Sequence, residues 1–214
     1  MPGVFTVYYH EGFSGRAQPL EMMLAATKQT WKRAPFSSLE DPTVFACPAV
    51  GHDQSGKVVS QTAAAAQWLG DVLFLAPPTS LKPEAMKVAL DLADIWSEIY
   101  GKRRDAKTWD DIEAFLGGRL AKWFAVLEAC VAKWGNGFLF GGKPTYVDFL
   151  LLNVVTTSEF LVGKARMAPL LGASPKVAAV VSATLALPGV KECKESLPEL
   201  YGSVAEGGKM PFRS

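Results

Sequence analysis

The order of apolar and polar positions predicts a strand, a helix and a second strand at the front of the chain. Residues 4–9 read VFTVYY, a run of β-branched and aromatic side chains that is typical of a strand. Phe5, Val7 and Tyr9 share one face of that strand, because successive side chains point to opposite sides. Both faces are apolar enough for a central strand covered on each side. The segment RAQPLEMMLAATKQ then predicts a helix, and residues 30–36 predict a second short strand.

Residues 47–70 predict a strand, a tight turn, a second strand and a helix. Pro48 restricts the preceding residue to an extended conformation, and a cis bond there would give a sharp bend. Residues 51–56 carry turn chemistry, and KVV is a short β-branched strand. Residues 60–62 then open the run AAAAQWL, which has a high helix propensity. A hydroxyl before a strong helix indicates an N-cap, although the unpaired N–H groups of such a helix end also suit a carboxylate ligand.

Beyond the proline-rich segment GDVLFLAPPTSLKP the chain is predicted to be helical. Apolar residues at three- and four-residue steps predict long helices over 82–100 and 109–134, which the short connection between them makes antiparallel. The first of these helices is expected to bury the face formed by Met86, Leu90, Ala93, Trp96 and Tyr100. Thr145 with Asp148 three residues later forms a capping box, and residues 147–162 predict a buried helix.

Composition and charge narrow the functional classes. The 214 residues are 49% hydrophobic and 20% charged, which is ordinary for a soluble globular protein. A formal net charge of +1 provides no overall field that would favour nucleic acid or an anionic membrane. The N-terminus lacks the plan of a signal peptide, and no apolar run approaches the roughly 20 residues of a membrane helix. Three cysteines without paired spacing favour a reducing compartment, so we expect a cytoplasmic protein; they are Cys47, Cys130 and Cys193.

Most catalytic motifs are poorly supported. The two histidines, His10 and His52, have no cysteine or acid at ligand spacing, so no metal site is expected. A serine triad has no nucleophile elbow, and the sequence GGK lacks the spacing of a phosphate loop. Cys47 could be a reactive thiol, but one cysteine without a CxxC partner is a weak redox signal. Tyr8 and Tyr9 end the first strand, where ligands of α/β sheets usually bind and where a phenol could donate to a developing anion.

The order and spacing of these pieces resemble the cytosolic glutathione transferase family of the tyrosine type, sigma- or alpha-like. The resemblance covers nearly the whole chain and rests on VYYHEGFSGRAQPLEMMLAA, CPAV, SQTAAAAQWLG, FLFGGKPTYVDFLLLNVV and SPKVAAVVSATLALPGVKE. It implies an α/β plus all-α fold, in which a domain with a mixed sheet is followed by a helical bundle. Residues 1–78 would form a thioredoxin-like domain that binds glutathione, and residues 79–214 an all-helical domain that forms the hydrophobic substrate site. It also implies a homodimer, with glutathione as co-substrate and no metal.

The resemblance assigns roles to particular positions. The implied glutathione-binding residues are Tyr9, Arg16, Cys47, Pro48, Gln61, Thr62 and Asp94. Pro48 would follow a cis bond, and the backbone of Cys47 would pair with the tripeptide as a strand does. Gln61 and Thr62 match the pair that holds the γ-glutamyl carboxylate where the alanine-rich helix begins. Asp94 is implied to reach the glutathione of the partner subunit.

Three hydroxyl groups are candidates for the catalytic donor. Tyr9 is favoured, because the alternation Phe5, Val7, Tyr9 gives the parity of the family's tyrosine. The turn after the strand is about one residue longer than usual, which leaves Tyr8 open, and some branches of the family use a serine near the first helix, here Ser14. A hydroxyl that donates to the glutathione sulfur favours the thiolate, which then attacks the electrophile.

One departure from the family pattern concerns the loop before Pro48. The family often supplies a Trp and a Lys there to hold the glycyl carboxylate, whereas this loop reads RAPFSSLEDPTVFA, which leaves Lys32, Arg33 or His52 as substitutes. The expected function is transfer of glutathione to small hydrophobic electrophiles, as in detoxification. The alternatives are a non-catalytic binding or structural protein, as in lens crystallins or elongation-factor subunits, and a glutathione-dependent isomerase or peroxidase.

Overall fold

The strands form one mixed sheet. The computed structural model describes residues 2–12 and 14–196 of the chain. Its strands are β1 (Phe5–Tyr9), β2 (Trp31–Pro35), β3 (Ala49–His52) and β4 (Lys57–Ser60), in the order β2-β1-β3-β4. β1 runs parallel to β2 and antiparallel to β3, and β3 runs antiparallel to β4. The predicted mixed sheet is confirmed, and the first strand lies inside it.

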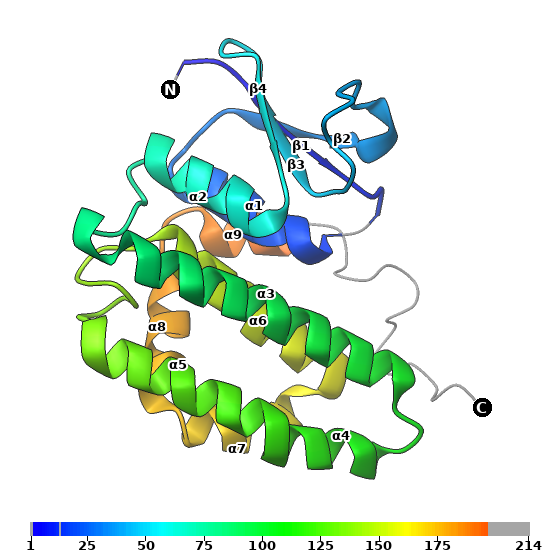
Figure 1. The fold of residues 1–214 in the computed structure, drawn as a ribbon, viewed down its shortest axis with the longest axis vertical. Coiled ribbons are helices and arrows are strands. Elements are labelled where there is room, and N and C mark those ends of the chain that lie inside the picture. Colours follow the sequence, from blue (N-terminus) through cyan, green and yellow to red (C-terminus); the bar gives the residue numbers. More distant parts are fainter. Residues whose placement is uncertain (1, 13, 197–214) are drawn as a thin grey trace.

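Two helices cover one face of this sheet. α1 (Gln18–Ala26) follows the short 3₁₀ turn η1 (Gly15–Ala17), and α2 (Thr62–Val72) follows β4 directly. Both lie between the sheet and the helical part of the chain (Figure 1). Phe5 and Val7 on the covered face are completely buried, whereas Thr6 and Tyr8 on the other face are half-buried. The expected burial of β1 is therefore complete on one face and partial on the other.

The helical part begins after the segment that follows α2. Its elements are η3 (Thr79–Leu81), α3 (Lys82–Asp105), α4 (Trp109–Phe115), the π-helix η4 (Leu116–Leu120), α5 (Ala121–Trp134), α6 (Tyr146–Val162), α7 (Lys164–Gly172), α8 (Pro175–Leu185) and α9 (Val190–Ser196). α4, η4 and α5 follow one another as a long rod antiparallel to α3 (Figure 1). The fold class is therefore the predicted one, α/β followed by all-α. The boundary between residues 78 and 79 stays a prediction.

α3 differs from its predicted form in two ways. It continues past residue 100 to Asp105, because the side chain of Arg103 is buried there and donates to the carbonyl of Leu161 at 3.0 Å. Its buried face is also not the predicted one, since Leu90 is 53% exposed. The buried side chains are instead Ala85, Val88, Ala89, Leu92, Ile95 and Ile99. α3 packs most extensively on α6, and the small alanines on this face allow the two helices to approach closely.

α6 is the buried helix that the sequence predicts. Nearly all of its residues are inaccessible to solvent. Its capping box is present: Asp148 Oδ2 accepts from the backbone N–H of Thr145 at 2.7 Å and from its hydroxyl at 2.8 Å. Asp148 Oδ1 accepts from the N–H of Leu139 at 2.8 Å, which ties the preceding loop to the helix. Within the described residues, none of the helices has the length and apolar character needed to cross a membrane.

Candidate active site

The candidate site lies where β1 ends beside the bend that leads into β3. The peptide bond between Cys47 and Pro48 is cis, as the resemblance implied. The carbonyl of Pro48 accepts from the N–H of Gln61 at 3.0 Å, so this bend is tied to the start of α2. On the other side, the sulfur of Cys47 lies 3.3 Å from Nε2 of His10, the residue after β1. These contacts bring the ends of β1, β3 and α2 together.

Tyr9 presents its phenol at this junction. The residue is 3% exposed, and its hydroxyl oxygen accepts from the backbone N–H of Arg16 at 3.2 Å. Burial raises the pKa of Tyr9, and the Arg16 N–H opposes that rise only in part. The phenol therefore keeps its proton at neutral pH. A phenol can accept one hydrogen bond at its oxygen and donate another through its O–H.

The two other candidate hydroxyls lie in less suitable places. Tyr8 points to the opposite face of the sheet from Tyr9, and its ring packs over Gly51 of β3. Ser14 is completely buried ahead of η1. The choice of Tyr9 over Tyr8 and Ser14 stays a prediction.

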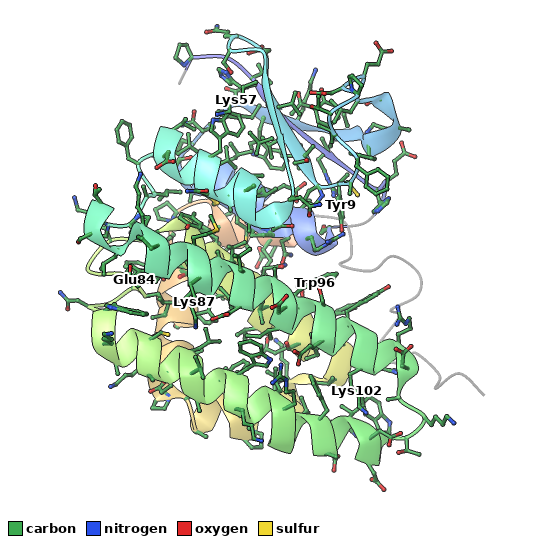
Figure 2. The ribbon with its side chains drawn as sticks, viewed as in Figure 1. Tyr9, Lys57, Glu84, Lys87, Trp96 and Lys102 are labelled. Atoms are coloured by element: carbon green, nitrogen blue, oxygen red, sulfur yellow. The ribbon has the colours of Figure 1, made fainter. Side chains whose placement is uncertain are left out.

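Arg16 connects the phenol to both other parts of the site. Its carbonyl accepts from the hydroxyl of Thr62 at 3.3 Å. Its guanidinium lies over the ring of Trp96 on α3, 5.6 Å from the ring centre. Figure 2 shows Tyr9 at the edge of the sheet and Trp96 on the neighbouring α3. The segment that carries Arg16 therefore joins the sheet, α2 and the helical part.

The start of α2 corrects one expectation. A hydroxyl within residues 60–62 was expected to cap the helix, but no side chain caps it, and the Thr62 hydroxyl donates to the carbonyl of Arg16 instead. The N-cap residue is Gln61, whose φ of 69° lies in the left-handed region that non-glycine residues rarely adopt. Backbone outliers of this kind cluster at ligand clamps. Gln61 is exposed at the N-cap position, and no side chain there accepts a hydrogen bond from the first backbone N–H groups of α2.

The three residues proposed from the sequence to hold the glycyl carboxylate, Lys32, Arg33 and His52, have different surroundings. His52 is 3% exposed, and its ring nitrogens lie 3.1 Å from Ser55 Oγ and 3.0 Å from the carbonyl of Pro2. It is therefore a structural residue and no substitute for the missing Lys and Trp. Lys32 is exposed on β2, and Arg33 forms an ion pair of 2.7 Å with the buried Glu21.

A cavity lies at the carboxyl ends of β1 and β2. Its volume is about 220 Å³, and it is lined by Tyr9, His10 and Arg33 together with Glu11, Gly12, Ala34 and Pro35. Ligands of α/β sheets usually bind at this end of the strands. The cavity therefore adds His10, which the sequence reasoning had considered only as a metal ligand, to the side chains of the site.

Asp94 does not join this group within one chain. It is exposed on α3, close enough to Arg119 to raise the pKa of that guanidinium together with Glu98. Its implied role toward a partner subunit stays a prediction. The described residues also contain no group of three or more His, Cys, Asp or Glu side chains that could hold a metal ion.

Asn153 is a site residue that sequence reasoning missed. Its side-chain amide donates to the carbonyl of Gly15 at 3.2 Å and to Gln18 Oε1 at 3.1 Å. All three groups are buried, and they fix the segment around Arg16 against α6. The signal in the sequence was an amide side chain in the middle of a helix that was predicted to be buried.

Comparison with known proteins identifies the domain in the helical part. Residues 91–196 match the family model of the glutathione S-transferase C-terminal domain. The fold resembles NaGST-2, with a TM-score of 0.73 and 21% identity over 91% of this chain and 97% of the other. It also resembles prostaglandin synthase D of Nilaparvata lugens, with a TM-score of 0.72 and 20% identity over 91% and 99% of the two chains.

A glutathione S-transferase of Caenorhabditis elegans matches with a TM-score of 0.69 and 18% identity over 92% of this chain and 99% of the other. Comparison with curated proteins gave no match. At these identities the structural likeness establishes the fold, and the matched domain accounts for the helical part. Residues 91–196 therefore carry the glutathione S-transferase C-terminal domain, and the chain, a mixed sheet followed by this helical domain, has the fold of the glutathione S-transferase structures that it matches.

Proposed function

We propose that this protein is a glutathione transferase that conjugates glutathione to small hydrophobic electrophiles. The observation that carries the proposal is the Tyr9 phenol. It is buried, protonated and held through its oxygen by the Arg16 N–H, and it lies beside the bend at Pro48 and the open start of α2. A phenol in this state can donate a hydrogen bond to sulfur.

Glutathione would bind along the edge formed by this bend. Its γ-glutamyl carboxylate would accept from the first N–H groups of α2, where a helix end favours an anion. The residue before Pro48 offers backbone groups for strand-like pairing with the tripeptide. The glycyl carboxylate would lie toward the cavity lined by Arg33 and His10. This arrangement leaves the sulfur next to Tyr9.

The chemistry then requires only that the thiol be ionised. A free thiol has a pKa of about 8.5 and is mostly protonated at neutral pH. A hydrogen bond from the Tyr9 phenol stabilises the thiolate more than the thiol and so lowers the pKa of the bound glutathione. The thiolate attacks the electrophilic carbon, and the leaving group departs with the electron pair. Binding both reactants side by side adds to the rate.

The electrophile would lie against α3. Trp96 and Tyr100 stack with their ring centres 5.4 Å apart, and both are half-buried on the helix that faces the sheet domain. Such a pair offers a flat apolar wall for an aromatic substrate. The cavity between the domains at Arg16, Thr62 and Trp96 is only about 30 Å³, so the electrophile would bind outside it. We expect Trp96→Ala to raise the KM for the electrophile more than the KM for glutathione.

The protein would act as a homodimer in the cytoplasm. Phe45 is 97% exposed in the loop that precedes Cys47, and the partner subunit would cover this side chain. Asp94 on the exposed side of α3 would reach the glutathione of that partner.

The proposal is tested by calorimetry with glutathione and by a conjugation assay with an aryl halide. Tyr9→Phe should lower kcat/KM on the order of 100-fold, as loss of one donor to a developing anion does. It should leave glutathione binding nearly unchanged and raise the pKa of the bound thiol, followed by thiolate absorbance. Tyr8→Phe is the matched control and should have little effect.

The other outcomes decide between the alternatives. Glutathione binding without turnover on any electrophile would favour a non-catalytic binding protein, and turnover of an isomerisation or peroxide substrate alone would favour those activities. A chain that does not bind glutathione would contradict the proposed function outright.

A further inference from the structure

Cys47 and His10 form a thiol–imidazole pair inside the candidate site. The sulfur and Nε2 are 3.3 Å apart, within hydrogen-bond distance for sulfur. The pair joins the residue after β1 to the residue before Pro48, so both strands position it. All three free cysteines are buried, and the other two lie away from this site, Cys130 on α5 and Cys193 on α9.

The thiol of Cys47 needs a neighbouring base in order to react. Burial raises the pKa of the Cys47 thiol, and the charge of Arg16 opposes this rise only in part. The resting sulfur is therefore a protonated thiol, which is a poor nucleophile. The imidazole of His10 is exposed and, in the tautomer with its proton on Nδ1, accepts the S–H proton at Nε2. A thiol with an adjacent general base is the usual arrangement of an activated nucleophile.

The pair is adjacent to the catalytic phenol. The rings of Tyr9 and His10 lie 4.9 Å apart, and both line the cavity at the ends of β1 and β2. An ionised Cys47 raises the pKa of Tyr9, so the thiol and the phenol are within electrostatic reach of each other. A tripeptide that pairs with the backbone of Cys47 would place its own cysteine opposite Cys47. Residues directly opposite in antiparallel strands have α-carbons about 4.5–5.5 Å apart, which lies within the range of about 4.4–6.8 Å that a disulfide spans.

We propose that Cys47 exchanges with glutathione disulfide and forms a mixed disulfide with one glutathione in the site. The thiol of Cys47 gives its proton to His10, and its sulfur attacks the disulfide sulfur that lies beside Tyr9. The sulfur–sulfur bond of glutathione disulfide breaks, and the second glutathione leaves as a thiolate that takes the proton from His10. Cys47 is oxidised, and one glutathione is released as the thiol.

The mixed disulfide regulates the same site. The bound glutathionyl group occupies the position of the co-substrate, so conjugation stops until a free thiol attacks the mixed disulfide and releases it. The inference rests on the proposed function, because it requires that glutathione bind along the bend before β3.

The test is incubation of the full chain with glutathione disulfide, followed by intact-protein mass spectrometry and peptide mapping. One glutathionyl group should be found on Cys47, and dithiothreitol should remove it. Conjugation activity should fall in step with the modification and return after reduction. Cys130→Ser is the matched control and should be modified on Cys47 as the wild type is, whereas Cys47→Ser and Cys47→Ala should remain unmodified.

The role of His10 has a kinetic test. At saturating glutathione disulfide, His10→Gln should slow the modification on the order of 100-fold, as loss of a general base does. A rate equal to that of the wild type would overturn the role of His10.

Two results separate the inference from the proposed function. A protein that binds and conjugates glutathione but is not modified, or is modified equally on Cys130 or Cys193, would overturn the inference alone. A protein that shows no calorimetric binding of glutathione would overturn both.

Discussion

Arg16 is the residue whose backbone holds the site together. Its N–H donates to the Tyr9 oxygen at 3.2 Å, and its carbonyl accepts from the Thr62 hydroxyl at 3.3 Å. Both hydrogen bonds use backbone groups of Arg16, so they do not depend on its side chain. The side chain instead contributes its charge and the stacking of its guanidinium on Trp96. The Tyr9 phenol and the start of α2 are thus positioned by the same peptide segment.

Loss of the Thr62 hydroxyl should weaken glutathione binding. Thr62 is the first residue of α2, and Thr62→Val removes its hydroxyl together with the hydrogen bond to the carbonyl of Arg16. One lost hydrogen bond of this kind costs about 1 kcal/mol, so Kd should rise roughly fivefold to tenfold. Calorimetric titration with glutathione measures this Kd. Thr62→Ser keeps the hydroxyl and should bind as the wild type does; equal affinity of the valine variant would show that the hydroxyl is not used.

At the scale of elements, α6 depends on its buried N-terminal acid. Asp148 is completely buried and accepts three hydrogen bonds from Leu139 and Thr145. The same capping box at α4 is built from Thr108 and Asp111 at the protein surface. The two helices therefore use one local motif in two environments.

Asp148→Ala should lower the free energy of unfolding by about 3 kcal/mol, because three buried groups lose their acceptor. Urea denaturation followed by circular dichroism measures the change. Asp111→Ala is the matched control, and its loss should be smaller because solvent can replace the carboxylate there. Equal losses in the two variants would contradict the importance of burial.

The contact between α1 and β2 should make stability depend on pH. Burial raises the pKa of Glu21 from 4.5 to about 7, despite the ion pair with Arg33. Since the folded state holds this proton more tightly than the unfolded chain, the contribution of Glu21 to the free energy of unfolding is complete below pH 4.5 and is lost as the pH rises through about 7. At about 1.4 kcal/mol per pH unit, the contribution is roughly 3 kcal/mol.

Glu21→Gln should remove that component. Denaturation midpoints measured from pH 4.5 to pH 8 should show a flatter profile for the variant than for the wild type. Glu40→Gln, on the exposed loop after β2, is the control and should leave the profile unchanged. A variant profile parallel to that of the wild type would show that Glu21 does not titrate in this range.

At the scale of the whole molecule, the two parts of the chain are tied together at several places. α9, near the end of the described chain, packs against α1 rather than staying within the helical part, and Asn153 of α6 holds the segment before α1. Figure 1 shows α1 and α2 enclosed between the sheet and α3 and α6. The segment that carries Arg16 is therefore held by elements of both parts of the chain.

The proposed dimer should depend on Phe45. If Asp94 reaches the partner's site, the loop before Cys47, which borders that site, must also lie against the partner. Phe45→Ala should shift the sedimentation of the protein from dimer to monomer, because a central aromatic anchor is commonly worth 2 kcal/mol or more. Phe74→Ala, which changes a side chain that is 94% exposed, is the control and should remain dimeric. A dimeric Phe45→Ala protein would contradict this placement.

Local patterns in the sequence were sufficient for much of the fold. The alternation of VFTVYY, the turn residues after β3, the alanine run of α2 and the Thr145–Asp148 box each specify a backbone conformation through short-range sterics and hydrogen bonds. The same patterns, read through the family resemblance, indicated the cis bond at Pro48 and the preference for Tyr9. These features need no knowledge of distant neighbours.

Tertiary packing decided what local patterns could not. Which stripe of α3 is buried depends on where α6 approaches, and the partner of the Thr62 hydroxyl depends on a segment 46 residues away. The contact of Cys47 with His10 spans 37 residues, and that of Asn153 with Gly15 spans 138. The sequence determined the elements, because short-range interactions suffice for them. Only the structure decided which polar groups meet at the end of β1, because those pairings follow from how the elements pack.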